Sequence, residues 1–239
     1  TVLAVSVIRL SRSKVLVQEL YCIETLARVD TLCLDKTGTL TEGRMEVSGL
    51  LGIDGDKPFV NKQDLENVLA KIAKASDDEN PTMQAIKEKY LNTLTKEFKV
   101  NKKIAFSSKT KWSGINFENE GSYVLGAPEF VLKDYYSKFK NEIQKYTEDY
   151  RVLCVAHSSE NFVEGLPEKL EVVGFVLIKD VIRKEASKTL EYFKEQCVDI
   201  KIISGDNPIT VSKIAKRVGL KKAENYIDMS TLKTEQEIL

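Results

Sequence analysis

The stretch "VDTLCLDKTGTLTEG", residues 29–43, decides the fold of this chain. Its first seven residues form a short, mostly apolar run that is typical of a buried parallel β-strand. The run ends on Asp35, and the Lys-Thr-Gly-Thr that follows predicts a turn. Open α/β sheets bind ligands at the carboxyl ends of their strands. Asp35 is therefore the first candidate for a catalytic side chain.

Composition narrows the class of protein without identifying its activity. The 239 residues suffice for one large domain or two modest ones, and 42% apolar with 30% charged residues is typical of a soluble globular protein. Lys and Arg total 36, as do Asp and Glu, so the charge balance indicates no nucleic-acid partner. The four cysteines are widely separated, which argues against a zinc site or disulfide framework and favours a reducing cytosol.

The first ten residues, "TVLAVSVIRL", are apolar and are followed closely by basic side chains. The run is shorter than the roughly 20 residues that a helix needs to cross a bilayer. It nevertheless ends at Arg9, Arg12 and Lys14, as a membrane helix does on its cytoplasmic side. Composition alone leaves two readings open, the end of a membrane helix and an ordinary amphipathic segment.

Hydrophobic spacing divides the rest of the chain into strands and helices. Helices are predicted over 62–76 and 80–94, the second capped by Asn80, and a period near two from about residue 97 predicts an antiparallel sheet. The strand–helix alternation outside this region predicts an α/β domain with a doubly wound parallel sheet, into which an α+β domain is inserted. Further strands are expected at 14–20, 150–158, 170–180 and 198–206, a loop or hairpin at 50–62, and helices at 24–29, 128–139, 183–197 and 207–219.

Three acids, Asp35, Asp180 and Asp206, each follow an apolar strand and are expected at one edge of the parallel sheet. Aspartate is common in turns, so Asp180 and Asp206 alone would not indicate a site. Asp35 differs because its carboxylate can attack phosphorus and hold the phosphoryl group as an acyl phosphate. The N–H groups of the Thr-Gly-Thr turn can hold phosphoryl oxygens, Ser204 can donate to them, and a divalent metal is needed to offset the charge.

The segment "DKTGTLT", residues 35–41, resembles the phosphorylation motif of the P-type ATPases, which have a haloacid dehalogenase-like fold. The resemblance covers nearly the whole chain. It implies a doubly wound parallel sheet, incomplete at the C-terminus, with an inserted α+β nucleotide-binding domain built on an antiparallel sheet. The other similar segments are "FSSKTKWSG" (106–114), "GAPE" (126–129), "RVL" (151–153), "KDVIR" (179–183) and "ISGDN" (203–207).

The same resemblance implies how the chain divides into domains. Residues 1–28 would be a stub and linker from the fourth membrane helix. Residues 29–46 and 172–239 would form a discontinuous, truncated phosphorylation domain, and residues 47–171 the nucleotide-binding domain. The chain stops before the family's Gly-Asp-Gly-x-Asn-Asp motif, so this fragment is expected to bind ATP weakly and to autophosphorylate poorly.

The resemblance also implies roles for the residues around the turn. Asp35 would be the nucleophile that takes the γ-phosphoryl group of ATP. Thr37, Ser204 and Gly205 would contact the phosphoryl group. Magnesium would be held by Asp35 and by the main-chain carbonyl of Thr37.

A second set of residues is expected to bind the nucleotide. Phe106 would stack on adenine, and Lys111 and Arg151 would meet the phosphates or the ribose. Asp180 and Arg183 would help to hold the nucleotide and orient the two domains. The resemblance places two further residues in this site, Gly126 and Asp206.

Thr37 occupies the position at which most phosphatases of this fold have a second aspartate. A hydroxyl is a poor base near neutral pH, so the acyl phosphate is expected to persist. A lasting phosphoenzyme suits a pump, which must change conformation before the acyl phosphate is hydrolysed. In the family, a glutamate on a separate actuator domain carries out dephosphorylation, and no such domain is found in this sequence.

Some positions depart from the family pattern. Leu125 replaces the Lys that precedes Gly-Ala-Pro-Glu, and Met83 stands where many relatives have Glu. Asn80 stands in for the His of metal pumps. These changes predict weakened or rearranged adenine binding. His157, the only histidine, is expected to be structural or on the surface.

The preferred function is therefore the catalytic fragment of an ATP-driven pump, with a divalent cation such as Ca²⁺ as its cargo. The full-length protein would lie in the cell membrane, with this part facing the cytoplasm. Its partners would be ATP, Mg²⁺, the cation bound by an absent membrane domain, and the actuator domain. The alternatives are a soluble haloacid dehalogenase-like phosphatase or phosphomutase with a cap domain, and a nucleotide-binding regulatory module without catalysis.

Overall fold

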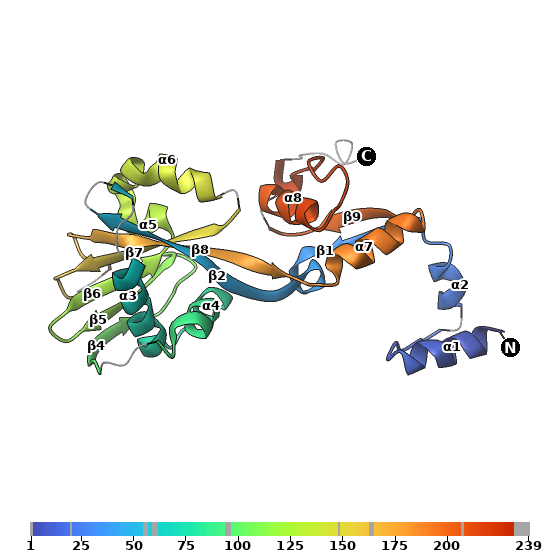
Figure 1. Ribbon diagram of the computed structural model, residues 1–239, viewed down its shortest axis with the longest axis horizontal. Coiled ribbons are helices and arrows are strands. Elements are labelled where there is room, and N and C mark those ends of the chain that lie inside the picture. The colour runs from blue at the N-terminus through green and yellow to red at the C-terminus, as the bar shows by residue number, and fades with distance from the viewer. Residues whose placement is uncertain are drawn as a thin grey trace. The chain divides into compact units, whose positions relative to one another are not determined.

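The computed structural model (Figure 1) describes residues 2–19, 21–54, 57–58, 62–93, 97–147, 149–162, 165–206 and 208–231. The chain forms two compact units, Thr1–Leu40 with Ile182–Leu239, and Thr41–Val181. The predicted domain boundaries at 46/47 and 171/172 fall inside two long strands, β2 (Thr41–Asp54) and β8 (Glu171–Ile182). The functional assignment of those domains stays a prediction.

The unit Thr41–Val181 is built on a seven-stranded sheet with the order β3-β2-β8-β7-β6-β5-β4. Neighbouring strands from β4 to β8 pair antiparallel, and for β4, β5 and β6 the alternation of the sequence predicted this pairing. Of the loop or hairpin expected at 50–62, the antiparallel pair β2–β3 is present and residue 62 begins a helix, while residues 55, 56 and 59–61 lie outside the described residues. The remaining strands are β3 (Lys57–Pro58), β4 (Val100–Ile104), β5 (Trp112–Phe117), β6 (Gly121–Gly126) and β7 (Arg151–Ser158).

Helices cover both faces of this sheet (Figure 1). Val176 and Ile178 of β8 belong to the hydrophobic core beside α3 (Lys62–Ala75) and α4 (Pro81–Tyr90). Phe175 and Leu177 belong to the core beside α5 (Pro128–Leu132) and α6 (Tyr136–Thr147), which the short 3₁₀ helix η2 (Lys133–Tyr135) separates. Since successive side chains of a strand point to opposite faces, this alternation places one pair of helices on each side.

The pairing of strand β8 differs from the prediction. Residues 170–180 were expected to contribute to the doubly wound parallel sheet, but Glu171–Ile178 pair antiparallel with β7. A continuous apolar run marks a strand that is buried on both faces, which is typical of parallel sheets. Here helices on both sides bury an antiparallel strand in the same way, so the run could not distinguish the two arrangements.

The other unit contains a parallel pair of strands, β1 (Thr31–Asp35) and β9 (Asp199–Ile203), as predicted. Leu40, Ala186, Leu190 and Val218 form its buried cluster. The α/β fold class is thus confirmed, with a parallel sheet and a separate antiparallel sheet. The helices of this unit are α1 (Val2–Arg12), α2 (Cys22–Leu26), α7 (Ala186–Glu195), α8 (Pro208–Arg217) and the 3₁₀ helix η3 (Met229–Thr231).

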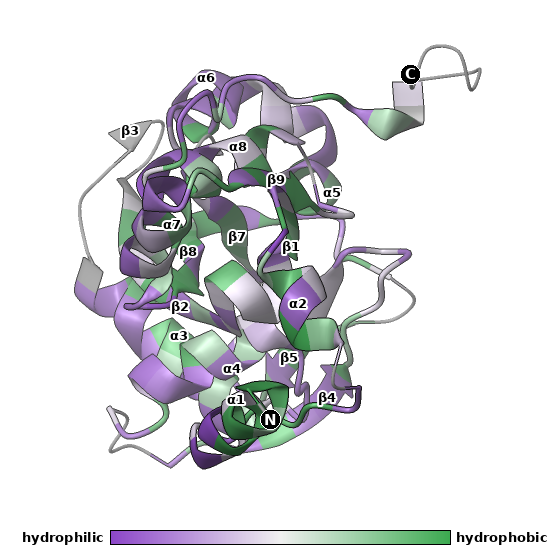
Figure 2. Cartoon of the chain, turned by 90° about the vertical axis from the view of Figure 1, so that its right-hand side faces the viewer, coloured by the Kyte–Doolittle hydropathy of each residue, from purple (hydrophilic) through white to green (hydrophobic). Residues whose placement is uncertain are grey.

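The first residues of the chain differ from one expectation. The strand expected at 14–20 is absent from its described part, residues 14–19, where Leu16 is 86% exposed and no neighbouring strand offers hydrogen bonds. Hydrophobic residues line much of α1 (Figure 2), and Val2, Val5 and Ile8 are exposed. No described helix is both long and apolar enough to cross a membrane.

The four cysteines are all unpaired and differ in burial, which leads to a simple labelling prediction. Cys154 in β7 is fully buried, and burial raises the pKa of its thiol by disfavouring the thiolate. We expect iodoacetamide to alkylate Cys154 at least about a hundredfold more slowly than exposed Cys33 and Cys197. Mass spectrometry of the native and guanidinium-unfolded chain checks this result. Equal labelling rates of Cys154 and Cys33 in the native chain would contradict it.

Candidate functional site

Asp35 is the last residue of β1 and its side chain is exposed. It lies opposite Ile203, the last residue of β9, in the parallel register. Because the two strands run in the same direction, the residues that follow them emerge at the same edge. Ser204 and Gly205 come directly after β9, so the sheet brings them to the edge that carries Asp35.

The chain turns sharply after Asp35. Thr37 has φ −79° and ψ 122°, and Gly38 has φ 78° and ψ −9°, which are the values of a type II turn. The second central residue of such a turn needs positive φ, and glycine adopts it without steric cost. The glycine of the motif is therefore required by the backbone that presents the turn's N–H groups beyond Asp35.

Arg183 forms two hydrogen bonds to the backbone in and just after this turn. Its Nη2 donates a hydrogen bond of 2.8 Å to the carbonyl oxygen of Gly38. Its main-chain N–H also donates to the carbonyl oxygen of Leu40 at 2.9 Å. The exposed guanidinium, which the sequence assigned to nucleotide binding, thus contacts the backbone of the turn that follows Asp35 in this structure.

The Arg183 contact can be tested by substitution. We expect Arg183→Ala to slow phosphoenzyme formation by the full-length protein about fivefold, because a hydrogen bond to the turn contributes about 1 kcal/mol. Lys184→Ala removes a neighbouring exposed cation and serves as the control. The initial rate of labelling by ATP that carries a radioactive γ-phosphate measures both variants. Equal rates for the two variants would show that the turn does not depend on this guanidinium.

Lys36 is a site residue that the sequence reasoning missed. Its side chain is buried, and its ammonium forms an ion pair with the Asp206 carboxylate. The Asp206 N–H in turn donates to Ser204 Oγ at 3.2 Å. Asp206 was assigned to nucleotide binding, whereas here it links the segments that follow β1 and β9. The sequence did contain a signal for this ion pair: Lys36 comes one residue after β1, Asp206 comes three residues after β9, and these two strands pair.

Asp180 does not lie where the sequence predicted. It was expected to follow a strand of the parallel sheet, but it lies half-buried within β8, which continues to Ile182. It belongs to the unit Thr41–Val181, in which β8 pairs antiparallel with β7. The structure therefore does not assign Asp180 to the edge that carries Asp35 and Asp206. Its role toward a nucleotide stays a prediction.

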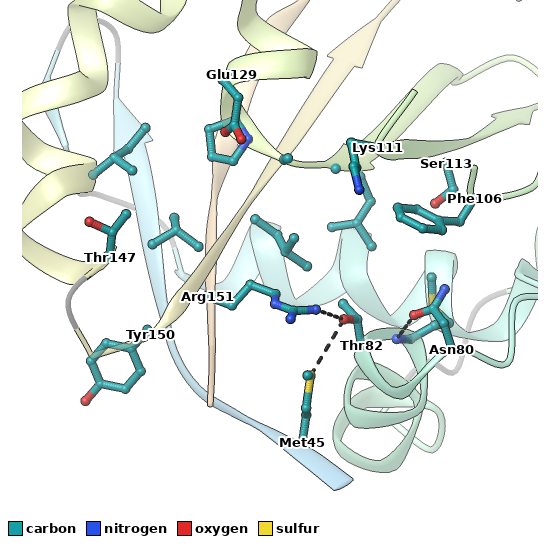
Figure 3. Close-up of a pocket in the computed structure, with 18 of the residues that line it drawn as sticks. Met45, Asn80, Thr82, Phe106, Lys111, Ser113, Glu129, Thr147, Tyr150 and Arg151 are labelled. Atoms are coloured by element: carbon teal, nitrogen blue, oxygen red, sulfur yellow. Dashed lines mark hydrogen bonds between the residues drawn. The ribbon is translucent and has the colours of Figure 1, made fainter. Parts of the chain in front are cut away.

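The unit Thr41–Val181 contains a cavity of about 480 Å³, a size typical of small-ligand sites (Figure 3). Four residues predicted to bind nucleotide line it together: Phe106, Lys111, Gly126 and Arg151. Phe106 and Lys111 come from the loop between β4 and β5. Gly126 ends β6, and Arg151 begins β7. Residues from three separate segments therefore converge on one cavity.

The cavity combines an apolar wall with cationic side chains. Met83 and Leu125, two of the departures from the family pattern, are buried and contribute apolar surface to the wall. Arg151 Nη1 donates to Thr82 Oγ1 at 3.3 Å, and Thr82 Oγ1 lies 3.8 Å from Met45 Sδ (Figure 3). The wall suits a planar apolar ring, and the lysine and arginine suit anionic groups.

Gly126 allows β5 and β6 to approach closely beside the cavity. A Cβ at this position would lie 2.5 Å from Trp112 Cβ and 2.7 Å from the Lys111 carbonyl oxygen. That carbonyl oxygen accepts a hydrogen bond of 2.9 Å from the Ala127 N–H, and the Lys111 N–H donates to the Ser107 carbonyl oxygen at 2.7 Å. Because Gly126 has no Cβ, the backbone of Lys111 can lie this close to it, and the Lys111 side chain projects from that backbone.

The oxygen atoms near Asp35 fit a magnesium ion. Among the described residues, no three His, Cys, Asp or Glu side chains gather into a group that could hold a metal by themselves. Magnesium does not need such a group, because it usually keeps several waters and binds one or two carboxylates together with substrate phosphates. The exposed Asp35 carboxylate and the Thr37 carbonyl oxygen are ligands of this kind.

The fold and the site together define the class of the chain. The haloacid dehalogenase-like hydrolase family matches residues 29–235, and the chain belongs to this family. A "Probable cation-transporting ATPase exp7" of Streptococcus pneumoniae serotype 4 is 38% identical over 242 residues, which is 100% of this chain and 30% of that protein. A "Calcium-transporting ATPase CtpE" of Mycobacterium bovis is 39% identical over 219 residues, 91% of this chain and 27% of that protein.

A solved structure has the same fold. The crystal structure of a zinc-transporting PIB-type ATPase in its E2.Pi state has a TM-score of 0.64 and 23% identity, and the match covers 86% of this chain and 30% of that one. This chain thus spans less than a third of each of these proteins. The resemblance to P-type ATPases that was drawn from "DKTGTLT" is confirmed.

Proposed function

We propose that this chain is the catalytic part of an ATP-driven cation pump and that Asp35 accepts the γ-phosphoryl group of ATP. The observation that carries the proposal is the exposed Asp35 carboxylate at the end of β1, between a type II turn and the residues that follow β9. This arrangement offers a nucleophile and hydrogen-bond donors at one sheet edge. The relatives at 38% and 39% identity are both described as cation-transporting or calcium-transporting ATPases.

The reaction is a phosphoryl transfer to a carboxylate. One Asp35 oxygen attacks the γ-phosphorus, the bond from that phosphorus to the β–γ bridging oxygen breaks, and ADP leaves with the electron pair. N–H groups of the turn and the Ser204 hydroxyl donate to the phosphoryl oxygens. Bound magnesium would be held by Asp35 and the Thr37 carbonyl, and it supplies positive charge that offsets the charge of the phosphates.

The cavity of the other unit is the proposed nucleotide site. The Phe106 ring would stack on the adenine, and base–aromatic stacking contributes about 1–3 kcal/mol. Lys111 and Arg151 would pair with the ribose or the phosphates. Met83 and Leu125 give the wall apolar surface where family members have charge, so packing contributes more to base binding here than hydrogen bonding does.

Thr37 favours the pump over a soluble phosphatase or phosphomutase. In those enzymes a second aspartate activates the water that releases the phosphoryl group, and the exposed Thr37 hydroxyl cannot act as such a base near neutral pH. The phosphoenzyme would therefore persist until another part of the pump, the actuator domain, supplies the base. A regulatory module without catalysis would have no need for a nucleophile at this edge.

Calcium is the proposed cargo, and the calcium-transporting relative at 39% identity supports it. The cation would bind in a membrane domain of the full-length protein, with the present chain on the cytoplasmic side of the cell membrane. The test uses full-length protein in membrane vesicles and ATP that carries a radioactive γ-phosphate. An acid-stable, hydroxylamine-sensitive label whose amount rises with Ca²⁺ supports the proposal. A label that is absent under all cation conditions overturns it, and a label that responds only to another cation overturns the calcium assignment.

A further inference from the structure

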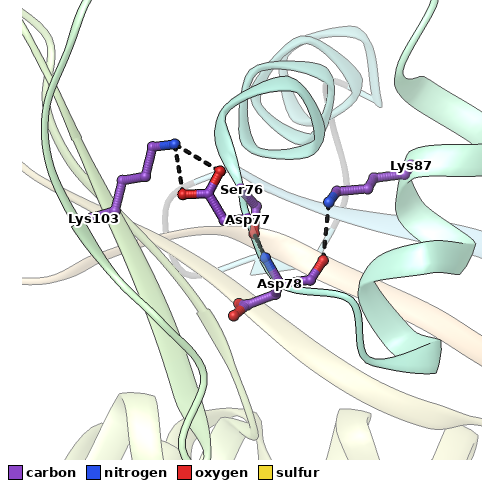
Figure 4. Close-up of polar contacts among 5 residues, drawn as sticks. All are labelled: Ser76, Asp77, Asp78, Lys87 and Lys103. Atoms are coloured by element: carbon purple, nitrogen blue, oxygen red, sulfur yellow. Dashed lines mark hydrogen bonds and ion pairs between the residues drawn. The ribbon is translucent and has the colours of Figure 1, made fainter.

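The connector between α3 and α4, residues 76–80, is tied to the elements on either side of it (Figure 4). The Asp78 N–H donates to Ser76 Oγ at 3.1 Å, and Lys87 Nζ of α4 donates to the Asp78 carbonyl oxygen at 2.9 Å. Lys103 Nζ of β4 contacts both carboxylate oxygens of Asp77, at 2.9 and 3.0 Å. The backbone of Asp78 is therefore held by its own connector and by α4.

The Asp78 carboxylate makes a different contact. Figure 4 shows it directed away from Lys87. Its two oxygens accept the main-chain N–H of Phe106 at 3.1 and 3.3 Å. Phe106 stands in the loop between β4 and β5, it lines the cavity, and the residue is 43% exposed. A ring with so much exposed surface has little packing to fix it, so its position depends on how its backbone is held.

We propose that Asp78 is a positioning residue for nucleotide binding, which holds Phe106 where its ring can stack on the base. This inference rests on the proposed function of the cavity. A carboxylate that accepts a backbone N–H makes a charge-assisted hydrogen bond, which is stronger than a neutral one. It fixes the loop before the ligand arrives, so less conformational freedom is lost when the nucleotide binds.

The first test measures ATP affinity of the 239-residue chain by calorimetry. Asp78→Ala removes the acceptor and is expected to weaken ATP binding about tenfold. Asp78→Asn keeps one acceptor oxygen and is expected to stay within about threefold of the wild type. Asp77→Ala removes the pair with Lys103 on the same connector but leaves the Phe106 contact, so it is the matched control and should change the affinity less than twofold.

The second test asks whether Asp78 acts through Phe106. Phe106→Ala is expected to weaken ATP binding by about tenfold or more, because the stacking surface is lost. If Asp78 serves only to position that ring, Asp78→Ala should cause no further loss in the Phe106→Ala background. Inorganic tripolyphosphate has no base, so any binding of it should be equal in the wild type and in Asp78→Ala. A general loss of structure would instead weaken the binding of both ligands.

The outcomes separate this inference from the proposed function. A tenfold loss for Asp78→Ala that disappears in the Phe106→Ala background supports it. An unchanged ATP affinity in Asp78→Ala, or an equal loss in both backgrounds, overturns the positioning role and leaves the nucleotide site in place. A lowered thermal unfolding midpoint together with weaker tripolyphosphate binding also overturns it, since the residue would then be structural. Wild-type chain that binds no ATP overturns the assignment of the cavity to the nucleotide and, with it, the positioning role of Asp78, whereas the proposal for Asp35 is tested separately by phosphoenzyme labelling of the full-length protein.

Discussion

Asp35→Asn is expected to abolish phosphoenzyme formation by the full-length protein, with a loss of at least about a thousandfold. The amide has nearly the same shape as the carboxylate but lacks the charged oxygen that attacks phosphorus. Because Asp35 is exposed at the end of β1, the substitution should leave the free energy of unfolding almost unchanged. The loss would therefore be chemical rather than structural. Acid-quenched labelling with radioactive ATP measures it.

Asp30→Asn is the matched control for this substitution. Asp30 is also exposed, and it stands just before the start of the same strand, with its carbonyl oxygen accepting the Asp199 N–H at 2.7 Å. The main-chain bond survives a change of side chain, so Asp30→Asn should label as the wild type does. Label retained in Asp35→Asn at the level of Asp30→Asn would place the phosphoryl group on another residue. The site described here would then be wrong.

The parallel strand pair could be predicted because its evidence is local. An apolar run that ends on an aspartate and a glycine turn specifies both the strand and the edge at which Asp35 emerges. The parallel register then brings Ser204 to that edge without further information. The partner of β8 could not be predicted, because burial on both faces gives the same sequence pattern in parallel and antiparallel sheets.

The contacts missed at the site share one physical cause. Lys36 pairs with Asp206, and Asp78 binds the Phe106 N–H, in each case between segments that are distant along the chain. Periodicity and turn chemistry report on neighbours in sequence, whereas these contacts depend on which elements the fold brings together. The sequence predicted that Phe106 binds the nucleotide, but it held no signal for the Asp78 carboxylate that accepts the main-chain N–H of Phe106.

Gly126→Ala is expected to destabilise the unit Thr41–Val181 by about 1–3 kcal/mol, the usual cost of forcing atoms into a close-packed site. The new Cβ would lie 2.5 Å from Trp112 Cβ and 2.7 Å from the Lys111 carbonyl oxygen. These atoms belong to or adjoin the backbone, so the strands must separate rather than a side chain rotate. That separation displaces Lys111 and widens the cavity, so ATP affinity should fall about tenfold or more.

Gly49→Ala provides the comparison within the same sheet. A Cβ on Gly49 of β2 would meet Leu177 Cδ1 at 3.5 Å, which is an ordinary van der Waals contact. The free energy of unfolding should therefore change by less than about 0.5 kcal/mol in Gly49→Ala. Urea unfolding and ATP titration of both variants separate the effect of the close approach from that of losing a glycine. If Gly126→Ala were as stable as Gly49→Ala and bound ATP as tightly, the approach of β5 and β6 would not shape the site. Because both substitutions add the same methyl group to a strand of the same sheet, a difference between them reports on the space around each glycine.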